Sequence, residues 1–211
     1  MKYLSTQLLD GLYSQTETNI SKAISEWQLL SARVMNSEPG PGAWSASQCL
    51  EHLNSYGRYY LPAIEKAMAK TAGNKPALYF KSSWLGNYFY KMMLPENNGS
   101  IKKKMKSPKN HQPGRQPDSA KLLSEFISQL ETLGRLLREA HATDLNQVRV
   151  PVSIAPFIKL KLGDTFLFLT AHIARHILQA ERALRSAVKE NNESPRAGGK
   201  PALRNETQFI R

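Results

Sequence analysis

The stretch "LTAHIARHILQAERAL", Leu169 to Leu184, decides the fold because it has the pattern of a helix with one buried face. Apolar residues in and just before it recur at intervals of three and four: Phe166, Leu169, Ile173, Ile177, Ala180 and Leu184. Asp164 is placed to open this helix, and the pattern persists to about Val188. His172 and His176 lie one turn apart beside the apolar arc, so both rings are predicted to point toward the protein interior.

The chain before this helix predicts three further long helices. The first extends over about 4–35, with apolar residues at Ile20, Ile24, Trp27, Leu30 and Val34. The second covers about 44–70. The third begins after a cap at Asp118 or Ser119, and its inner stripe is Leu123, Phe126, Leu130, Leu133 and Leu137. Four such helices around one core predict an all-α protein with the architecture of a four-helix bundle.

The remaining segments are predicted to be smaller elements or loops. "SSWLGNYFYKMML" predicts a short extra helix over about 84–93, whereas 95–117 is Lys- and Pro-rich and predicts a long basic loop. The segment 148–164 contains two prolines and predicts an extended connector that lies across the bundle. We therefore expect one bundle domain over 1–190, followed by a disordered polar tail over 191–211.

Composition narrows the class of protein. The chain has 211 residues, 41% of them hydrophobic, which is enough for one compact domain with its own core. It has no apolar run of 18 residues, and its N-terminus lacks the unbroken apolar core of a signal peptide. The single cysteine, Cys49, cannot form an internal disulfide, so we expect a cytoplasmic protein. The net charge of +12 favours an anionic partner: nucleic acid, a membrane surface or a negatively charged small molecule.

The histidines suggest a metal site. Two imidazoles four residues apart on a helix can bind one ion at about 2.0–2.1 Å. His52, at the edge of the inner face of the helix over 44–70, is a candidate third ligand. Three neutral histidines would leave coordination positions open for water or substrate, as in catalytic metal sites. The alternative is that these histidines are hydrogen-bonded core residues. His141 is better explained as a partner of a helix C-terminus, and His111 falls in the basic loop, so neither is assigned to the site.

Two motifs, "WSASQCLEHL" and "FLFLTAHIARHILQAERAL", make the chain resemble the DinB-like superfamily, also called the DinB/YfiT-like metalloenzymes. The resemblance covers about 4–188. It rests on a Trp-Ser helix start, a histidine seven residues after that serine, and a late helix with two histidines and a glutamine: Trp44, Ser45, His52, His172, His176 and Gln179. Ser45 and Gln48 also form the pattern of a helix capping box.

The resemblance implies a four-helix bundle with a divalent metal, usually zinc or nickel, held by His52, His172 and His176, and often a homodimer. Characterised relatives include thiol-dependent S-transferases, which use bacillithiol, mycothiol or glutathione, and a maleylpyruvate isomerase. This chain has "ARHILQ" where many relatives have His-His-x-Gly-Gln. The departure leaves the ligands in place but puts the substrate pocket in doubt.

Three further residues are candidates for a catalytic role. Tyr56 lies one turn after His52 and is an acid, a substrate hydrogen-bond donor or a half-buried bundle residue. Gln179 orients His176 or contacts substrate. Arg175 is placed to recognise a carboxylate, unless it is simply solvated. Cys49 is a poor candidate nucleophile because it follows the helix start as a small apolar residue.

The function predicted from the sequence is that of a metal-dependent enzyme, a thiol-dependent S-transferase or a related hydrolase, with a small-molecule substrate and a low-molecular-weight thiol. The alternative is a non-catalytic protein that binds nucleic acid or an anionic membrane surface through its basic loop, with Lys102, Lys103, Lys104, Lys106, Lys109 and Arg115. The aromatic short helix beside "KKKMK" is the other basis for membrane binding.

Overall fold

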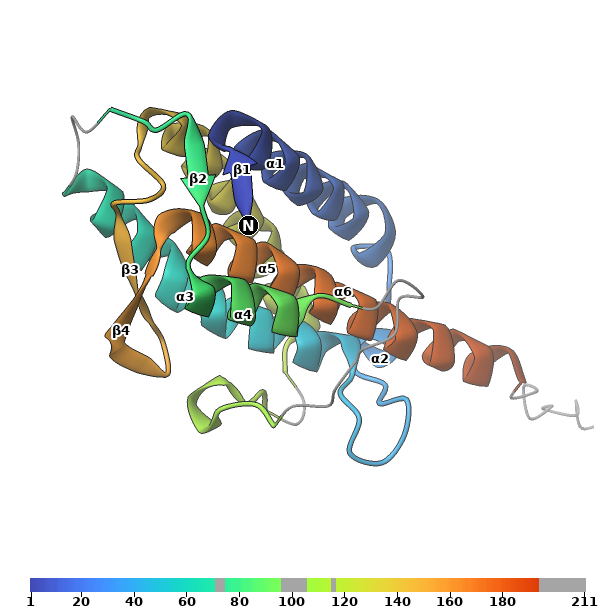
Figure 1. Cartoon of the computed structure of the whole chain (residues 1–211). Coiled ribbons are helices and arrows are strands. Elements are labelled where there is room, and N and C mark those ends of the chain that lie inside the picture. Colours follow the sequence, from blue (N-terminus) through green and yellow to red (C-terminus); the bar gives the residue numbers. More distant parts are fainter. Residues whose placement is uncertain (71–74, 96–105, 115–116, 194–211) are drawn as a thin grey trace, which may run out of the picture.

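The computed structural model describes residues 1–70, 75–95, 106–114 and 117–193. Its four long helices are α1 (Ser5–Lys22), α3 (Ala46–Ala69), α5 (Ser119–Glu139) and α6 (Leu162–Glu193). They form a bundle in which α1 packs on α5, α5 on α3, and α3 on α6, while α6 also contacts α1 (Figure 1). The prediction of an all-α four-helix bundle is confirmed.

The N-terminal region differs from the single helix predicted over 4–35. Helix α1 continues into a π-helical turn, Ala23–Trp27, and after a short break into α2 (Ala32–Met35). In that turn the Gln28 N–H donates to the carbonyl of Ala23, five residues earlier, at 3.2 Å. The extra residue in the turn accompanies the burial of Trp27, whose ring stacks on Phe126 of α5 at 6.4 Å. The interruption of the α-helix thus coincides with the packing of one large aromatic side chain against α5.

Helix α3 begins where the capping pattern predicts. The Gln48 N–H donates to Ser45 Oγ at 3.2 Å, and the Ser45 N–H donates to Gln48 Oε1 at 2.9 Å. This capping box satisfies backbone donors at the helix start and sets the rotation of the helix that carries His52.

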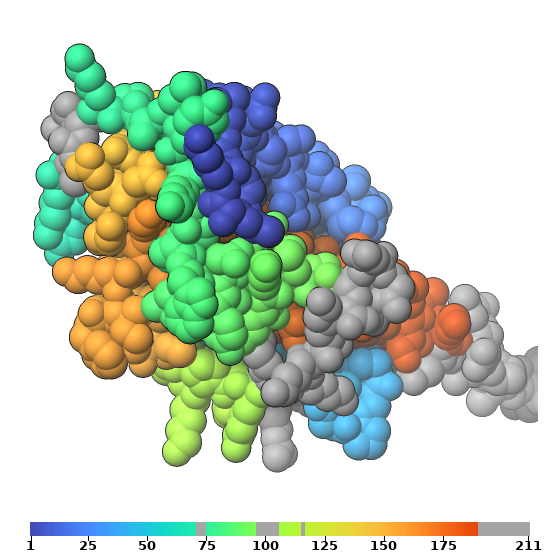
Figure 2. Space-filling view, viewed as in Figure 1, coloured from blue at the N-terminus to red at the C-terminus, as the bar shows by residue number. Residues whose placement is uncertain are grey.

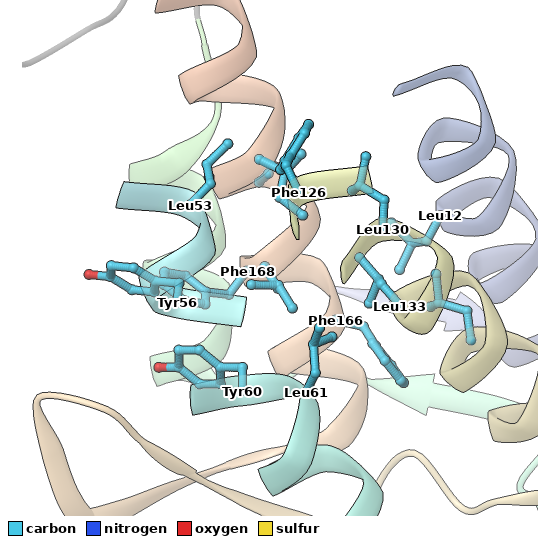
Figure 3. Packing of buried hydrophobic residues seen from close by; sticks show 14 of the residues in the cluster. Leu12, Leu53, Tyr56, Tyr60, Leu61, Phe126, Leu130, Leu133, Phe166 and Phe168 are labelled. Atoms are coloured by element: carbon cyan, nitrogen blue, oxygen red, sulfur yellow. The ribbon is translucent and has the colours of Figure 1, made fainter. Parts of the chain in front are cut away.

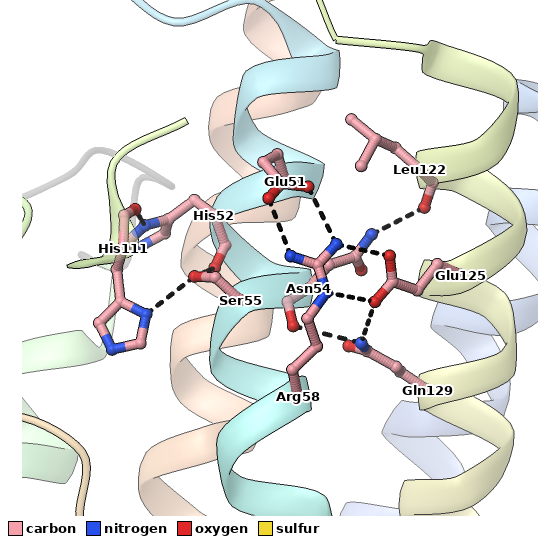
Figure 4. A network of polar contacts seen from close by, with 9 residues as sticks. All are labelled: Glu51, His52, Asn54, Ser55, Arg58, His111, Leu122, Glu125 and Gln129. Carbon is pink, nitrogen blue, oxygen red and sulfur yellow. Dashed lines mark hydrogen bonds and ion pairs between the residues drawn. The ribbon is translucent and has the colours of Figure 1, made fainter. Parts of the chain in front are cut away.

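Polar contacts hold α3 against α5 on the side away from α6 (Figure 4). Asn54 Nδ2 donates to the Leu122 carbonyl at 2.9 Å. Arg58 donates to Glu125 at 2.6 Å and to Glu51 at 2.9 Å. Because Asn54 and Arg58 bond to residues of α5, the face of α3 opposite to them is the one that packs on α6.

The core lies between the helices (Figure 3). Leucines and phenylalanines of all four long helices fill it, and the largest fully buried side chains include Leu9, Leu50, Phe126, Leu130, Leu133 and Phe166. Figure 3 also shows Tyr56 and Tyr60 on one side of α3, with Phe168 of α6 beside Tyr56. This aromatic group marks the end of the hydrophobic core nearest the candidate site.

The predicted short helix is present as α4 (Trp84–Met93), which packs along α6. Its start is held by Asp164 of α6, which accepts hydrogen bonds from the Ser83 N–H at 3.1 Å and the Ser83 hydroxyl at 2.7 Å. Strand β2 (Tyr79–Lys81) precedes α4 and pairs antiparallel with β1 (Lys2–Leu4), a small sheet that the sequence did not predict. Figure 2 shows α4 and this sheet covering one face of the bundle.

The segment predicted as an extended connector is extended, but it forms a hairpin. Strand β3 (Arg149–Val152) pairs antiparallel with β4 (Ala155–Lys161). One face of the hairpin is packed against the rest of the protein. Its buried side chains are those of Val150 and Val152 in β3 and of Leu160 in β4. The pairing satisfies backbone groups that a lone connector would leave open.

Two predicted segments fall largely outside the described residues. Of the basic loop, 106–114 is described and contains a 3-10 turn, Lys109–His111, while 96–105 and 115–116, with most of its lysines, are not. At the other end α6 continues to Glu193, so the first three residues of the predicted tail are helical, and 194–211 lies outside the described residues. The polar run that ends α6 contains neither Gly nor Pro, and polarity alone does not end a helix. None of the helices in the described ranges is both long and apolar enough to cross a membrane.

Candidate metal centre

Helices α3 and α6 bring the three predicted histidines together. His52 of α3 faces His172 and His176 of α6, and its Nε2 lies 3.1 Å from the Nε2 of His172. The ring centroids of His52 and His176 are 4.5 Å apart, and those of His172 and His176 are 4.6 Å apart. One nitrogen from each ring can be chosen so that all three lie within 4.8 Å of one another. The cluster could therefore hold a metal ion.

The cluster is buried between two aromatic rings. His52 and His172 are each 3% exposed and His176 is 8% exposed. The Trp44 ring lies 5.0 Å from His52 and 6.0 Å from His176, while the Tyr56 ring lies 4.4 Å from His172. These rings limit the contact of the histidine nitrogens with bulk water.

Burial keeps the three imidazoles neutral. Desolvation lowers the pKa of His52 to about 4. It also lowers the pKa of His172 and of His176 well below the usual value, and the neighbouring charges of the other histidines and of Arg175 act in the same direction. Neutral imidazole is the form that binds a metal ion, so near pH 7 the cluster is in its ligand form.

One hydrogen bond determines which nitrogen of His52 carries the proton. Its Nδ1 lies 2.7 Å from the main-chain carbonyl oxygen of His111. A carbonyl oxygen only accepts, so Nδ1 is the donor, and in the neutral ring the lone pair is on Nε2, the atom that faces His172. Metal-bound histidines commonly donate their other ring N–H to a carbonyl in this way.

His111 itself is a residue of the site that the sequence prediction missed. Its buried ring has Nδ1 2.9 Å from Ser55 Oγ (Figure 4). Its Nε2 lies 3.2 Å from Ser153 Oγ. The Ser55 hydroxyl donates to the His52 carbonyl at 2.7 Å, so it accepts from His111 Nδ1 and the Ser153 hydroxyl donates to Nε2. The His111 ring also packs against Tyr56 at 4.0 Å. Its partners are 42 and 56 residues away in the chain, so no local pattern could indicate this role.

The three other candidate residues lie around the cluster. Tyr56 is buried, and desolvation, followed by the charge of Tyr60, raises its pKa to about 12. It therefore stays protonated near pH 7. Arg175 is 4% exposed, so the interpretation of a solvated arginine is wrong, and burial lowers its pKa. Gln179 is half-buried, and its side chain raises the pKa of His176, opposite to the effect of burial.

Two other polar residues have structural roles. Cys49 is fully buried in α3, and burial raises the pKa of its thiol far above neutrality, which agrees with its dismissal as a nucleophile. His141 follows α5 in a 3-10 turn, and its Nε2 lies 3.2 Å from a carboxylate oxygen of Asp10 in α1. It is outside the cluster.

The donor set fits a divalent ion. Two nitrogens that bind one tetrahedral ion at about 2.0–2.1 Å stand about 3.4 Å apart, close to the 3.1 Å between the facing nitrogens of His52 and His172. The Nδ1 atoms of His172 and His176 are buried and have no hydrogen-bond partner among the described residues, so each of these rings has a nitrogen that the protein leaves unsatisfied.

A four-helix bundle with three buried, neutral histidines from two helices defines a class of helical proteins that can bind a metal between their helices. The family model described as the DinB superfamily matches residues 14–180. The chain belongs to the DinB superfamily, as the two sequence motifs predicted. Searches of curated proteins and of solved structures gave no significant match.

Proposed function

We propose that the protein is a metal-dependent enzyme in which His52, His172 and His176 hold one divalent ion, zinc or nickel. The observation that carries the proposal is the 3.1 Å separation of two histidine Nε2 atoms from different helices, in a cluster where burial keeps the rings neutral. If His52 and His172 were only a hydrogen-bonded pair in the core, the pair would not require the ring of His176 beside it. Such a pair would also not explain why the buried Nδ1 atoms of His172 and His176 have no partner among the described residues. Membership of the DinB superfamily supports the same assignment.

The reaction that fits this site best is transfer of a small thiol to an electrophilic substrate, with hydrolysis as the alternative. A divalent ion with open coordination positions lowers the pKa of a bound thiol or water, so that the nucleophile exists near neutral pH. Apolar and aromatic side chains line the cavity beside the cluster, which suits an organic thiol better than bulk water. The only cysteine is buried with a raised pKa, so the thiol would come from a second substrate.

The protein's own residues have defined parts in this proposal. The His52 tautomer is held by the His111 carbonyl, which keeps the Nε2 lone pair directed into the cluster. Tyr56 retains its proton and can donate a hydrogen bond to the substrate or to a developing negative charge. Arg175 places a positive charge beside the two α6 histidines, which favours an anionic nucleophile.

The test is the metal content of the full chain purified without chelators, measured by elemental mass spectrometry. We expect about one zinc or nickel ion per chain, and loss of most of it in His52→Ala, His172→Ala and His176→Ala. His141→Ala is the matched control, because this histidine lies outside the cluster, and it should keep its metal. Circular dichroism spectra of the variants should show the same helix content as the unmodified protein.

Two results would overturn the metal assignment: unchanged metal content in all three cluster variants, or no binding of zinc or nickel after reconstitution. If metal binds, the loaded protein is mixed with an alkylating electrophile and glutathione, cysteine or a related thiol. Thiol consumption above that of the His172→Ala protein supports the transferase, whereas substrate loss without thiol consumption favours the hydrolase.

A further inference from the structure

A cavity of about 180 Å³ lies beside the histidine cluster. Its wall combines aromatic rings and thioethers from α3, α4 and α6, and its other sides come from the β3–β4 hairpin and from the described part of the basic loop. The aromatic and thioether residues are Tyr56, Tyr60, Phe89, Met92, Met93 and Phe168.

The cavity and the histidine cluster share two residues as a common wall. The Phe168 ring stacks on His172 at 5.7 Å with an interplanar angle of 10°. Tyr56 contacts the rings of both His172 and His52, at 4.4 Å and 5.0 Å. A molecule in the cavity would therefore be separated from the histidines by at most one layer of aromatic side chains, and it would touch the Tyr56 and Phe168 rings directly.

The size and the lining of the cavity define the apolar part of its ligand. An apolar cavity of about 150 Å³ is large enough to hold benzene, so this one accommodates a single six-membered ring with a small substituent. Aromatic rings and methionine sulfur favour a flat, polarisable ring over an aliphatic chain of the same volume. Phe89, Tyr60 and Phe168 contribute rings to this wall.

The polar lining defines the substituent. Lys106 and Ser153 are the polar aliphatic side chains among the described lining residues, and none of those lining residues is acidic. The Tyr60 hydroxyl already accepts a hydrogen bond from the Ser153 N–H at 3.2 Å, and Ser153 Oγ is engaged with His111. Lys106 is thus the charged group at this cavity, and a cation there attracts a carboxylate.

We propose that this cavity binds a single-ring aromatic carboxylate, with the ring among Phe89, Tyr56 and Phe168 and the carboxylate near Lys106. The inference rests on the proposed function in one respect, since it makes this molecule the substrate class of the proposed enzyme, held next to the metal centre at the wall formed by Tyr56 and Phe168. Binding itself depends only on the cavity.

Isothermal titration calorimetry of the full chain with benzoate and with its neutral analogue benzamide tests the proposal. Both chelator-treated and zinc-loaded protein are used. We expect saturable benzoate binding to both forms, and weaker binding of benzamide. Lys106 is exposed, so Lys106→Gln should weaken benzoate about threefold to fivefold, the effect of one surface ion pair, and leave benzamide unchanged. Phe89→Ala should weaken both ligands about tenfold through lost apolar contact.

Each variant has a matched control. Lys109→Gln removes an exposed lysine from the same segment, and Tyr88→Ala removes an exposed aromatic residue from the same helix, and neither residue lines the cavity. Both controls should bind benzoate as the unmodified protein does. If they weaken it as much as Lys106→Gln and Phe89→Ala do, the cavity assignment is wrong.

The two protein forms separate failure of this proposal from failure of the metal assignment. Benzoate that binds only the zinc-loaded protein, with no effect of Phe89→Ala or Lys106→Gln, is a ligand of the ion alone, and this overturns the cavity proposal while the metal centre stands. Benzoate binding that is sensitive to both variants in a protein that takes up no zinc supports the cavity and rejects the metal centre. Absence of binding to both forms also overturns the proposal.

Discussion

His52 makes the stability of the metal-free protein depend on pH. Its pKa is about 4 in the folded protein, against an ordinary value near 6.5, so the unfolded chain binds more protons between these values. Stability is fully present above pH 6.5 and is lost as the pH falls toward 4. We expect His52 alone to cost on the order of 2 kcal/mol at pH 5 relative to pH 7.5. Urea unfolding of chelator-treated protein across this pH range measures the effect.

The control for this pH effect is His52→Gln, which cannot titrate between pH 4 and 7. Its unfolding free energy should depend less steeply on pH than that of the unmodified protein, by about the contribution of one histidine. His172 and His176, whose pKa values are lowered in the same direction, keep part of the slope in this variant. Equal slopes in the two proteins would mean that His52 titrates in the folded state as it does in the unfolded chain.

His111 should influence metal affinity although it is not in the cluster. Its side chain is held by Ser55 and Ser153, and this contact positions the carbonyl that accepts from His52. In His111→Ala we expect metal affinity to fall at least tenfold, the usual effect of losing a group that orients a ligand. Competition with a chelating dye measures the affinity. An unchanged affinity would show that the main-chain carbonyl of residue 111 stays in place without the His111 ring. His141→Ala is the control, because it removes a histidine that lies outside the cluster.

At the scale of elements, Gly86 allows α4 to approach α6. A Cβ at this position would lie 2.0 Å from the Asp164 Cγ, and the Asp164 carboxylate is fixed by hydrogen bonds from Ser82 and Ser83 at 2.6 to 3.1 Å. Gly86→Ala must displace either the carboxylate or the helix, so we expect a loss of about 1–3 kcal/mol in the free energy of unfolding. Denaturant unfolding measures it.

Gly11, in α1, is the matched control for this substitution. Nothing lies within 4 Å of a Cβ added there, so Gly11→Ala should stabilise the protein by about 0.5–1 kcal/mol through helix propensity alone. The two glycine variants are thus expected to differ in sign. Equal effects would mean that the contact between α4 and α6 adapts without cost.

The elements that the sequence predicted best are those specified by local signals. The start of α3 follows from the reciprocal pair Ser45 and Gln48, and the inner faces of α5 and α6 follow from repeats of three and four. The missed features depend on distant contacts. The π-helical turn accompanies the packing of Trp27 on Phe126, and the pairing of β1 with β2 joins residues almost 80 positions apart.

At the scale of the whole molecule, the same distinction explains the candidate site. His52 and His172 are 120 residues apart, yet both were identified because helical periodicity assigns each of them to an inward face, and a bundle brings inward faces together. His111 lies in a loop without periodicity, so its position depends on hydrogen bonds to α3 and to the hairpin. The cavity needs five segments at once, and its lining could not be predicted before those segments were placed.

An ion bound by ligands from α3 and α6 would stabilise the whole fold, because it binds only when the two helices are assembled. At a free ion concentration of 100 times the dissociation constant, the gain is about 2.7 kcal/mol, which for a chain of this size corresponds to a rise in Tm of about 5–10 °C. Thermal unfolding of chelator-treated protein with and without added zinc measures this shift. His141→Ala should show the full rise and His172→Ala almost none. If His172→Ala shows the same rise in Tm as His141→Ala, zinc stabilises the protein from a position other than the cluster. If the rise in Tm is lost in His172→Ala and kept in His141→Ala, the link between α3 and α6 is the source of the added stability.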